Sequence, residues 1–302
     1  MVLYFARKNA GNSAGDNQGG LLMGYDPTSK NQSQPRGGAD SGLLDDVVIT
    51  SDCMLDGTVA IAQPKSGFRV GTDAVFLSAS VGVNRGRILD LGAGVGGVSL
   101  CLATRLNKVQ ITAVELDPVL VALAQKNIVT NGFDDRLRVL TSDIQALPPV
   151  LGSSFDHVVS NPPYHFAMGT KSQNRRRALA HMGEGLTLDD WVKAAIWAAK
   201  PRGRISFICR ADRGGELVNL FINAGASETL QFPLWPRPMV PAGRVIIQVR
   251  KSVMGPGAIL PGLVIHNDDG SFTDAASRIM KGDGLYMGHP ARKARVVPAE
   301  SD

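Results

Sequence analysis

Short apolar segments alternate along this chain with longer segments in which apolar residues return every three or four positions. The short segments predict strands at residues 87–91, 109–115, 137–141, 155–160, 204–209, 227–232 and 245–249. The longer segments predict helices at residues 98–106, 118–131, 188–200 and 216–223. Alternation of this kind predicts an α/β fold, a Rossmann-like doubly wound sheet that is mainly parallel and covered by helices on both faces.

Polar residues at two of the expected helix starts support these boundaries. Asp117 suits an N-cap, with Pro118 at the first helical position. Thr187 and Asp190 have the spacing of a capping box, with Asp in place of the usual Glu. Both helices are therefore expected to begin at defined residues. Trp191 and Trp197, on the helix after Thr187, are expected to lie in the core.

The composition changes outside the alternating region. Residues 1–44 are rich in Gly, Ser, Asn and Gln and carry few large apolar side chains. Such a segment cannot offset the entropy lost on ordering, so we expect a disordered tail. Residues 45–255 are expected to form one domain that includes an N-terminal extension, and residues 256–302 a C-terminal extension with a basic tail.

Composition and charge restrict the class of protein. Apolar residues make up 44% of the 302, enough for a globular core, and the longest apolar segments are too short to cross a bilayer. Cys53, Cys101 and Cys209 lie far apart without pairing or metal-ligand spacing. We therefore expect buried free thiols, no metal site and a cytoplasmic location. The net charge of +5 is compatible with a nucleic-acid partner, as it is with many other partners.

A glycine-rich turn joins the strand at residues 87–91 to the next helix and reads DLGAGVGG over residues 90–97. Glycines let the backbone approach a ligand closely, and the helix end offers unpaired N–H groups. Gly92, Gly94 and Gly97 also satisfy the dinucleotide fingerprint, with Glu115 near the distance expected for a ribose-binding carboxylate. An NAD-binding protein is therefore a competing interpretation of this turn.

Two acidic residues favour a different cofactor. Asp90 stands two residues before Gly92, where dinucleotide sites usually carry an apolar residue. A carboxylate there would repel a pyrophosphate but could hold the cationic methionine end of S-adenosylmethionine. Asp143, just after the third strand, is placed to accept a hydrogen bond from the adenine amine of that cofactor. The alternative is that both residues merely cap strand ends.

Asn161, Pro162, Pro163 and Tyr164 directly follow the strand at residues 155–160. The side-chain oxygen of Asn161 and the carbonyl of Pro162 can accept the two hydrogens of an exocyclic amine, so that the nitrogen lone pair turns towards a sulfonium methyl group. The prolines restrict the backbone and preorganise these acceptors, and Tyr164 can stack on a base. The motif predicts an amino-group methyltransferase, although Asn-Pro also begins ordinary turns.

These motifs together resemble a known family. DLGAGVGG, AVELDP (residues 113–118) and SNPPYH (residues 160–165) are similar to the class I S-adenosylmethionine-dependent methyltransferases of the small-domain type. Residues 67–79, 175–195 and 263–282 further resemble the bacterial enzymes that methylate the exocyclic amine of an adenine beside the anticodon of a valine tRNA. The resemblance covers nearly everything after Asp45, and it implies a seven-stranded sheet, S-adenosylmethionine as cofactor and tRNA as substrate.

The resemblance also assigns roles to particular residues. It implies that Asn161, Pro162, Pro163 and Tyr164 surround the target amine. The cofactor-binding residues that it implies are Thr72, Asp90, Gly92, Gly94, Glu115, Asp143 and Asn161.

A basic segment follows the reactive motif, formed by Lys171, Arg175, Arg176 and Arg177. These side chains could grip substrate phosphates or form an ordinary solvated loop. Three other functions stay open. The first is a glutamine methyltransferase of release factors, which uses the same Asn-Pro-Pro-Tyr motif. The others are an enzyme that methylates a guanine amine of rRNA and a non-catalytic module that binds cofactor or RNA. We expect a monomer without membrane attachment.

Overall fold

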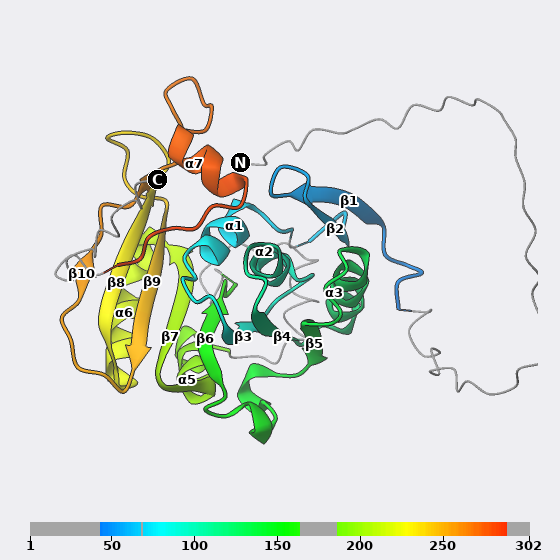
Figure 1. The fold of residues 1–302 in the computed structure, drawn as a ribbon, viewed down its shortest axis with the longest axis horizontal. Coiled ribbons are helices and arrows are strands. Elements are labelled where there is room, and N and C mark those ends of the chain that lie inside the picture. Colours follow the sequence, from blue (N-terminus) through cyan, green and yellow to red (C-terminus); the bar gives the residue numbers. More distant parts are fainter. Residues whose placement is uncertain (1–42, 68, 164–185, 289–302) are drawn as a thin grey trace, which may run out of the picture.

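The computed structural model describes residues 43–67, 69–163 and 186–288, which form a central sheet with helices packed against it (Figure 1). The seven main strands are β3 (Gly86–Leu91), β4 (Val109–Glu115), β5 (Leu137–Thr141), β6 (Phe155–Ser160), β7 (Ala199–Arg210), β8 (Ala226–Trp235) and β9 (Arg244–Lys251). The α-helices are α1 (Thr72–Ala79), α2 (Gly97–Arg105), α3 (Pro118–Thr130), α5 (Leu188–Ala198), α6 (Gly214–Asn223) and α7 (Asp274–Met280). Three short 3-10 helices are η1 (Ile144–Ala146), η2 (Pro149–Leu151) and η3 (Ala211–Arg213).

The sheet confirms the predicted fold class. Its strand order is β10-β8-β9-β7-β6-β3-β4-β5, and β9 runs antiparallel to both of its neighbours. The expected count of seven strands is too low. Within the described residues this sheet has nine strands, because the two-residue strands β10 (Ala258–Ile259) and β11 (Leu263–Val264) both pair with β8. Such short pairings carry no periodic signal that a sequence could show.

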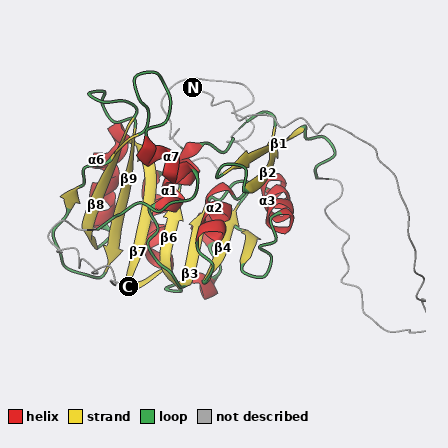
Figure 2. Ribbon diagram, turned by 45° about the horizontal axis from the view of Figure 1, so that its top comes forward, coloured by secondary structure: helices red, strands yellow, loops and turns green. Residues whose placement is uncertain are grey.

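Helices cover both faces of the sheet. Helices α1, α2 and α3 lie on one face with α7 beside α1, and α5 and α6 lie on the other (Figures 1 and 2). Successive strand residues point to opposite faces. Ile88 therefore belongs to the core under α1 and α2, and Leu89 to the core under α5 and α6. This two-sided burial explains why the parallel strands read as continuous apolar segments.

The predicted helix starts are confirmed. Asp117 accepts hydrogen bonds from the amides of Val119 and Leu120 at the start of α3, and Thr187 and Asp190 form the capping box of α5. The expected end of α5 near residue 200 is wrong. The helix ends at Ala198, since Ala199 begins β7 and pairs with Phe155 of β6.

A hairpin that the sequence analysis did not predict precedes α1. It consists of β1 (Ile49–Met54) and β2 (Val59–Pro64), which pair antiparallel. Leu55, Asp56 and Gly57 in its turn have φ of 49°, 55° and 87°. Asp-Gly between two short alternating segments is a hairpin signal, and it could have indicated this element.

The remaining expectations concern the cysteines, membrane-spanning helices and the two ends of the chain. Cys101 and Cys209 are buried free thiols, as expected. Cys53 is also a free thiol, but it is partly exposed, so its predicted burial is wrong. Within the described ranges no helix is long and apolar enough to span a membrane. The predicted tail at residues 1–44 and the predicted basic C-terminal end fall largely outside the described residues.

Candidate functional site

The candidate site lies where neighbouring parallel strands end. Leu91 of β3 pairs with Ser160 of β6, and the Ser160 hydroxyl donates to the Leu91 carbonyl at 2.8 Å. The glycine loop, residues 92–97, therefore leaves β3 beside the point where Asn161 leaves β6. Carboxyl ends of parallel strands are where doubly wound folds bind ligands. The fold thus brings the two predicted motifs together.

Positive backbone angles give the glycine loop its shape. Gly92, Gly94 and Gly96 have φ of 67°, 58° and 90°, in the left-handed region that favours glycine. The amides of Gly92 and Ala93 donate to the Val114 carbonyl at 2.9 and 3.0 Å, which ties the loop to β4. Gly96 is the N-cap of α2 and has no side chain with which to cap the helix amides. The amino end of α2 can therefore offer N–H groups to a ligand.

Glu115 connects the end of β4 to the glycine loop. Its Oε2 accepts from the Gly94 amide at 2.8 Å, and its Oε1 accepts from the amides of Leu116 and Asp117 at 2.8 and 3.0 Å. Burial raises the pKa of this carboxyl group, and the three amide donors oppose that rise. Glu115 therefore lies at the loop as predicted and holds it in place. Its contact with a ribose stays a prediction.

Asp90 lies beneath the glycine loop with only 1% of its surface exposed. Its Oδ2 accepts from the Ser99 hydroxyl in α2 at 2.7 Å. Burial raises the Asp90 pKa to about 7, and the nearby charge of Glu115 acts in the same direction. Two carboxyl groups at one loop suit a cationic ligand and disfavour a pyrophosphate, because like charges repel. The two carboxyl groups therefore fit S-adenosylmethionine better than a dinucleotide.

The remaining predicted residues occupy the same edge of the sheet or fall outside the described residues. Thr72 begins α1, and Asp143 follows β5, where its side chain accepts from the Gln145 amide. Pro162 is buried and Pro163 is exposed. Outside the described residues are Tyr164, Lys171, Arg175, Arg176 and Arg177.

Trp191 of α5 is a site residue that the sequence analysis missed. It was expected in the core, and it is only 3% exposed. Its ring packs on the first glycine of the loop, so closely that a Cβ at Gly92 would lie 2.7 Å from Cζ3 and closer still to Cη2. Its Nε1 is buried and has no hydrogen-bond partner among the described residues. Trp197, also expected in the core, is 42% exposed, so that prediction is wrong.

The sheet order, the glycine loop and the paired carboxyl groups together define a class I methyltransferase. The family model described as methyltransferase small domain matches residues 68–189. The tRNA1(Val) (adenine(37)-N6)-methyltransferase of Haemophilus influenzae strain PittEE is 36% identical over 160 residues, which are 52% of this chain and 68% of the relative. The chain therefore belongs to this family of S-adenosylmethionine-dependent methyltransferases.

Two further similarities extend the match. The enzyme of the same name from Actinobacillus pleuropneumoniae serotype 7 is 32% identical over 229 residues, covering 75% of this chain and 94% of the relative. The crystal structure of a predicted O-methyltransferase from Agrobacterium tumefaciens has a TM-score of 0.60 and 24% identity, and the match covers 71% of this chain and 98% of that one. The second similarity shows the shared fold.

Within the described ranges, no group of three His, Cys, Asp or Glu residues could hold a metal ion.

Proposed function

We propose that this protein transfers a methyl group from S-adenosylmethionine to the exocyclic amine of an adenine in tRNA, next to the anticodon. The names of the relatives from Haemophilus influenzae and Actinobacillus pleuropneumoniae support this substrate. The observation that carries the proposal is the position of Asn161. It follows Ser160, whose partner Leu91 directly precedes the glycine loop. Asn161 therefore leaves β6 next to the start of the glycine loop, which supports a role for its amide group at the cofactor.

In this proposal the described residues bind the cofactor and orient the adenine amine. Asp90 and Glu115 favour a cationic cofactor, which when bound supplies an electrophilic methyl group. The Asn161 side-chain oxygen and the Pro162 carbonyl accept the two hydrogens of the adenine amine and turn its lone pair towards that methyl group. Pro162 and Pro163 restrict the backbone, so the acceptors need little reorganisation. A preorganised hydrogen bond of this kind contributes about 10²–10³ in rate.

The test supplies purified protein with methyl-labelled S-adenosylmethionine and offers unmodified tRNA and, separately, release factors. Digested RNA is resolved into nucleosides. The proposal expects label in N6-methyladenosine and a loss of about 10²-fold or more in Asn161→Ala, with cofactor affinity measured in parallel. Asn223→Ala, an exposed substitution at the end of α6, serves as the control. Label in protein would instead assign glutamine methylation, and binding without transfer would assign a binding module.

The finer expectations belong to the same proposal. Residues 45–255 would form the methyltransferase domain of a cytoplasmic protein. The protein would be a monomer, and light scattering on the purified protein measures its oligomeric state. The basic segment would grip tRNA phosphates. Replacing Arg175, Arg176 and Arg177 by alanine would then raise the KM for tRNA and reduce its dependence on salt concentration, and the KM for S-adenosylmethionine would stay unchanged.

A further inference from the structure

Asn127 of α3 and Asn131, the C-cap of that helix, hold the edge of the N-terminal hairpin. Oδ1 of Asn127 accepts from the Ala62 amide at 2.7 Å and its Nδ2 donates to the Ala62 carbonyl at 2.9 Å. Asn131 makes the same pair of bonds with Ala60, at 2.9 and 2.7 Å. Four residues advance about 6 Å along a helix and two advance about 6.6 Å along a strand. The two amides therefore match the outward backbone groups of β2 and take the place of a neighbouring strand.

The two asparagines differ in their third hydrogen bond. Nδ2 of Asn127, which is buried, also donates to the Val95 carbonyl in the glycine loop at 3.0 Å. Nδ2 of Asn131 instead donates to the Asn127 carbonyl in the last turn of α3, at 2.7 Å. Each side chain thus makes three bonds. Asn127 links the hairpin to the glycine loop, and Asn131 links it to α3.

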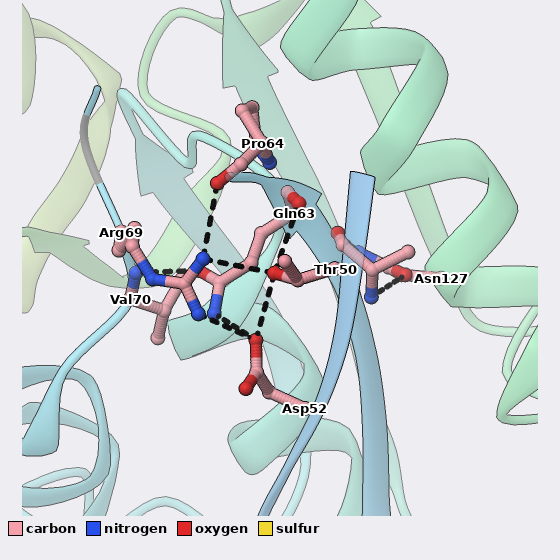
Figure 3. Close-up of polar contacts among 8 residues, drawn as sticks. Thr50, Asp52, Gln63, Pro64, Arg69, Val70 and Asn127 are labelled. Atoms are coloured by element: carbon pink, nitrogen blue, oxygen red, sulfur yellow. Dashed lines mark hydrogen bonds and ion pairs between the residues drawn. The ribbon is translucent and has the colours of Figure 1, made fainter. Parts of the chain in front are cut away.

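A second link runs through Gln63 at the end of β2. Oε1 of this buried side chain accepts from the Val70 amide at 2.9 Å, and its Nε2 donates to Asp52 at 2.8 Å (Figure 3). The Arg69 guanidinium donates to the same Asp52 oxygen at 2.6 Å and to the Thr50 hydroxyl at 2.8 Å. The hairpin therefore holds the segment that leads into α1.

Val70 carries this link to the cofactor side of the sheet. Its methyl groups lie against the first residue of α2, since a Cβ at Gly97 would be 2.6 Å from Cγ1 of Val70. The Gln63 link thus reaches the glycine loop at residue 97, and the Asn127 link reaches it at residue 95. Both links start from the same strand, β2.

We propose that Gln63 and Asn127 are positioning residues, through which the hairpin keeps the glycine loop in the geometry that binds S-adenosylmethionine. A loop released from these contacts adopts the binding geometry only part of the time, and the apparent Kd rises by the inverse of that fraction. The inference rests on cofactor binding at the glycine loop and not on the identity of the methyl acceptor. If this protein binds the cofactor but methylates no tRNA, the inference about Gln63 and Asn127 can be tested in the same way.

The test compares S-adenosylmethionine binding by calorimetry in the wild type, Asn127→Ala, Gln63→Leu and the matched control Asn131→Ala. The Kd is expected to rise about tenfold in the first two variants, as for a loop that is competent about one tenth of the time, and less than about twofold in the control. Amide hydrogen exchange of residues 92–97 is expected to become faster in the same two variants only. In a turnover assay the KM for S-adenosylmethionine rises while kcat and the KM for the acceptor stay unchanged.

Circular dichroism confirms that each variant is folded at the assay temperature, and Gln63→Leu decides the matter if Asn127→Ala does not fold. An equal rise of Kd in the two asparagine variants would overturn the inference, because the hairpin would then act only through general stability. Unchanged Kd values in Asn127→Ala and Gln63→Leu would overturn it as well.

Discussion

Replacing Gly92 by alanine tests the contact between the glycine loop and α5. Gly92 has a φ of 67°, and a Cβ built there would lie 2.7 Å from Cζ3 of Trp191 and closer still to Cη2. Non-bonded carbon atoms pack at about 3.5–4.0 Å. Trp191 is buried among the residues of the core under α5 and α6, so its ring cannot move aside without displacing them. The alanine methyl group must therefore shift the loop, the helix or both.

Two contributions set the size of the effect. A non-glycine residue in the left-handed region costs about 1 kcal/mol. Insertion of a methyl group into a close-packed region costs about 1–3 kcal/mol more. Gly132 provides a matched control, because it has a φ of 68° and a Cβ added there would meet no atom within 4 Å. Gly132→Ala should therefore cost about 1 kcal/mol, and Gly92→Ala about 2–4 kcal/mol.

Urea unfolding followed by circular dichroism measures both free energies. The same substitution in a Trp191→Leu background isolates the contact, since Gly92→Ala should then cost no more than the control. Equal losses of stability for Gly92→Ala and Gly132→Ala in the wild-type background would refute the reasoning. Binding of S-adenosylmethionine, measured on the same variants, should weaken in Gly92→Ala and stay unchanged in Gly132→Ala.

Two further predictions concern pH. Burial raises the Asp90 pKa from 3.8 to about 7, so ionising this carboxyl group in the folded state is costly. Without cofactor, the stability of Asp90→Asn relative to the wild type should therefore increase by roughly 2–3 kcal/mol when the pH is raised from 5 to 8. Urea unfolding at both pH values measures this difference, and the same difference at the two would contradict the prediction. Burial lowers the His157 pKa to about 3, so stability should fall as pH drops below 6.5. The wild type should therefore lose about 2 kcal/mol more than His157→Gln between pH 7 and pH 5, and parallel losses would argue against a buried neutral imidazole.

Much of the fold was predictable because its signals are local. The main strands, the helix caps at Asp117 and Thr187, and the glycine turn each depend on neighbours within a few residues. The motif at Asn161 was placed correctly for a related reason. Parallel strands that alternate with helices bring their carboxyl ends to one edge, so two strand-end motifs must meet there.

The chemistry of the site was predictable only in outline. The sequence identified Asp90 and Glu115 as candidate ligands, but their burial and their contacts with Ser99 and the Gly94 amide follow from the packed structure. Burial shifts a pKa, and burial depends on every element around the group. The exposure of Trp197, which lies on the same helix as buried Trp191, shows the same dependence.

By itself, the sequence determined the order of the seven main strands and of four helices, the glycine turn and the type of cofactor, since propensity, periodicity and motif chemistry are properties of short segments. Only the tertiary structure decided that Trp191 covers Gly92, that Asn127 and Gln63 join the hairpin to the glycine loop, and that β10 and β11 extend the sheet. These contacts join residues far apart in the chain. They exist because particular surfaces meet when the layers pack, and no short segment carries that information.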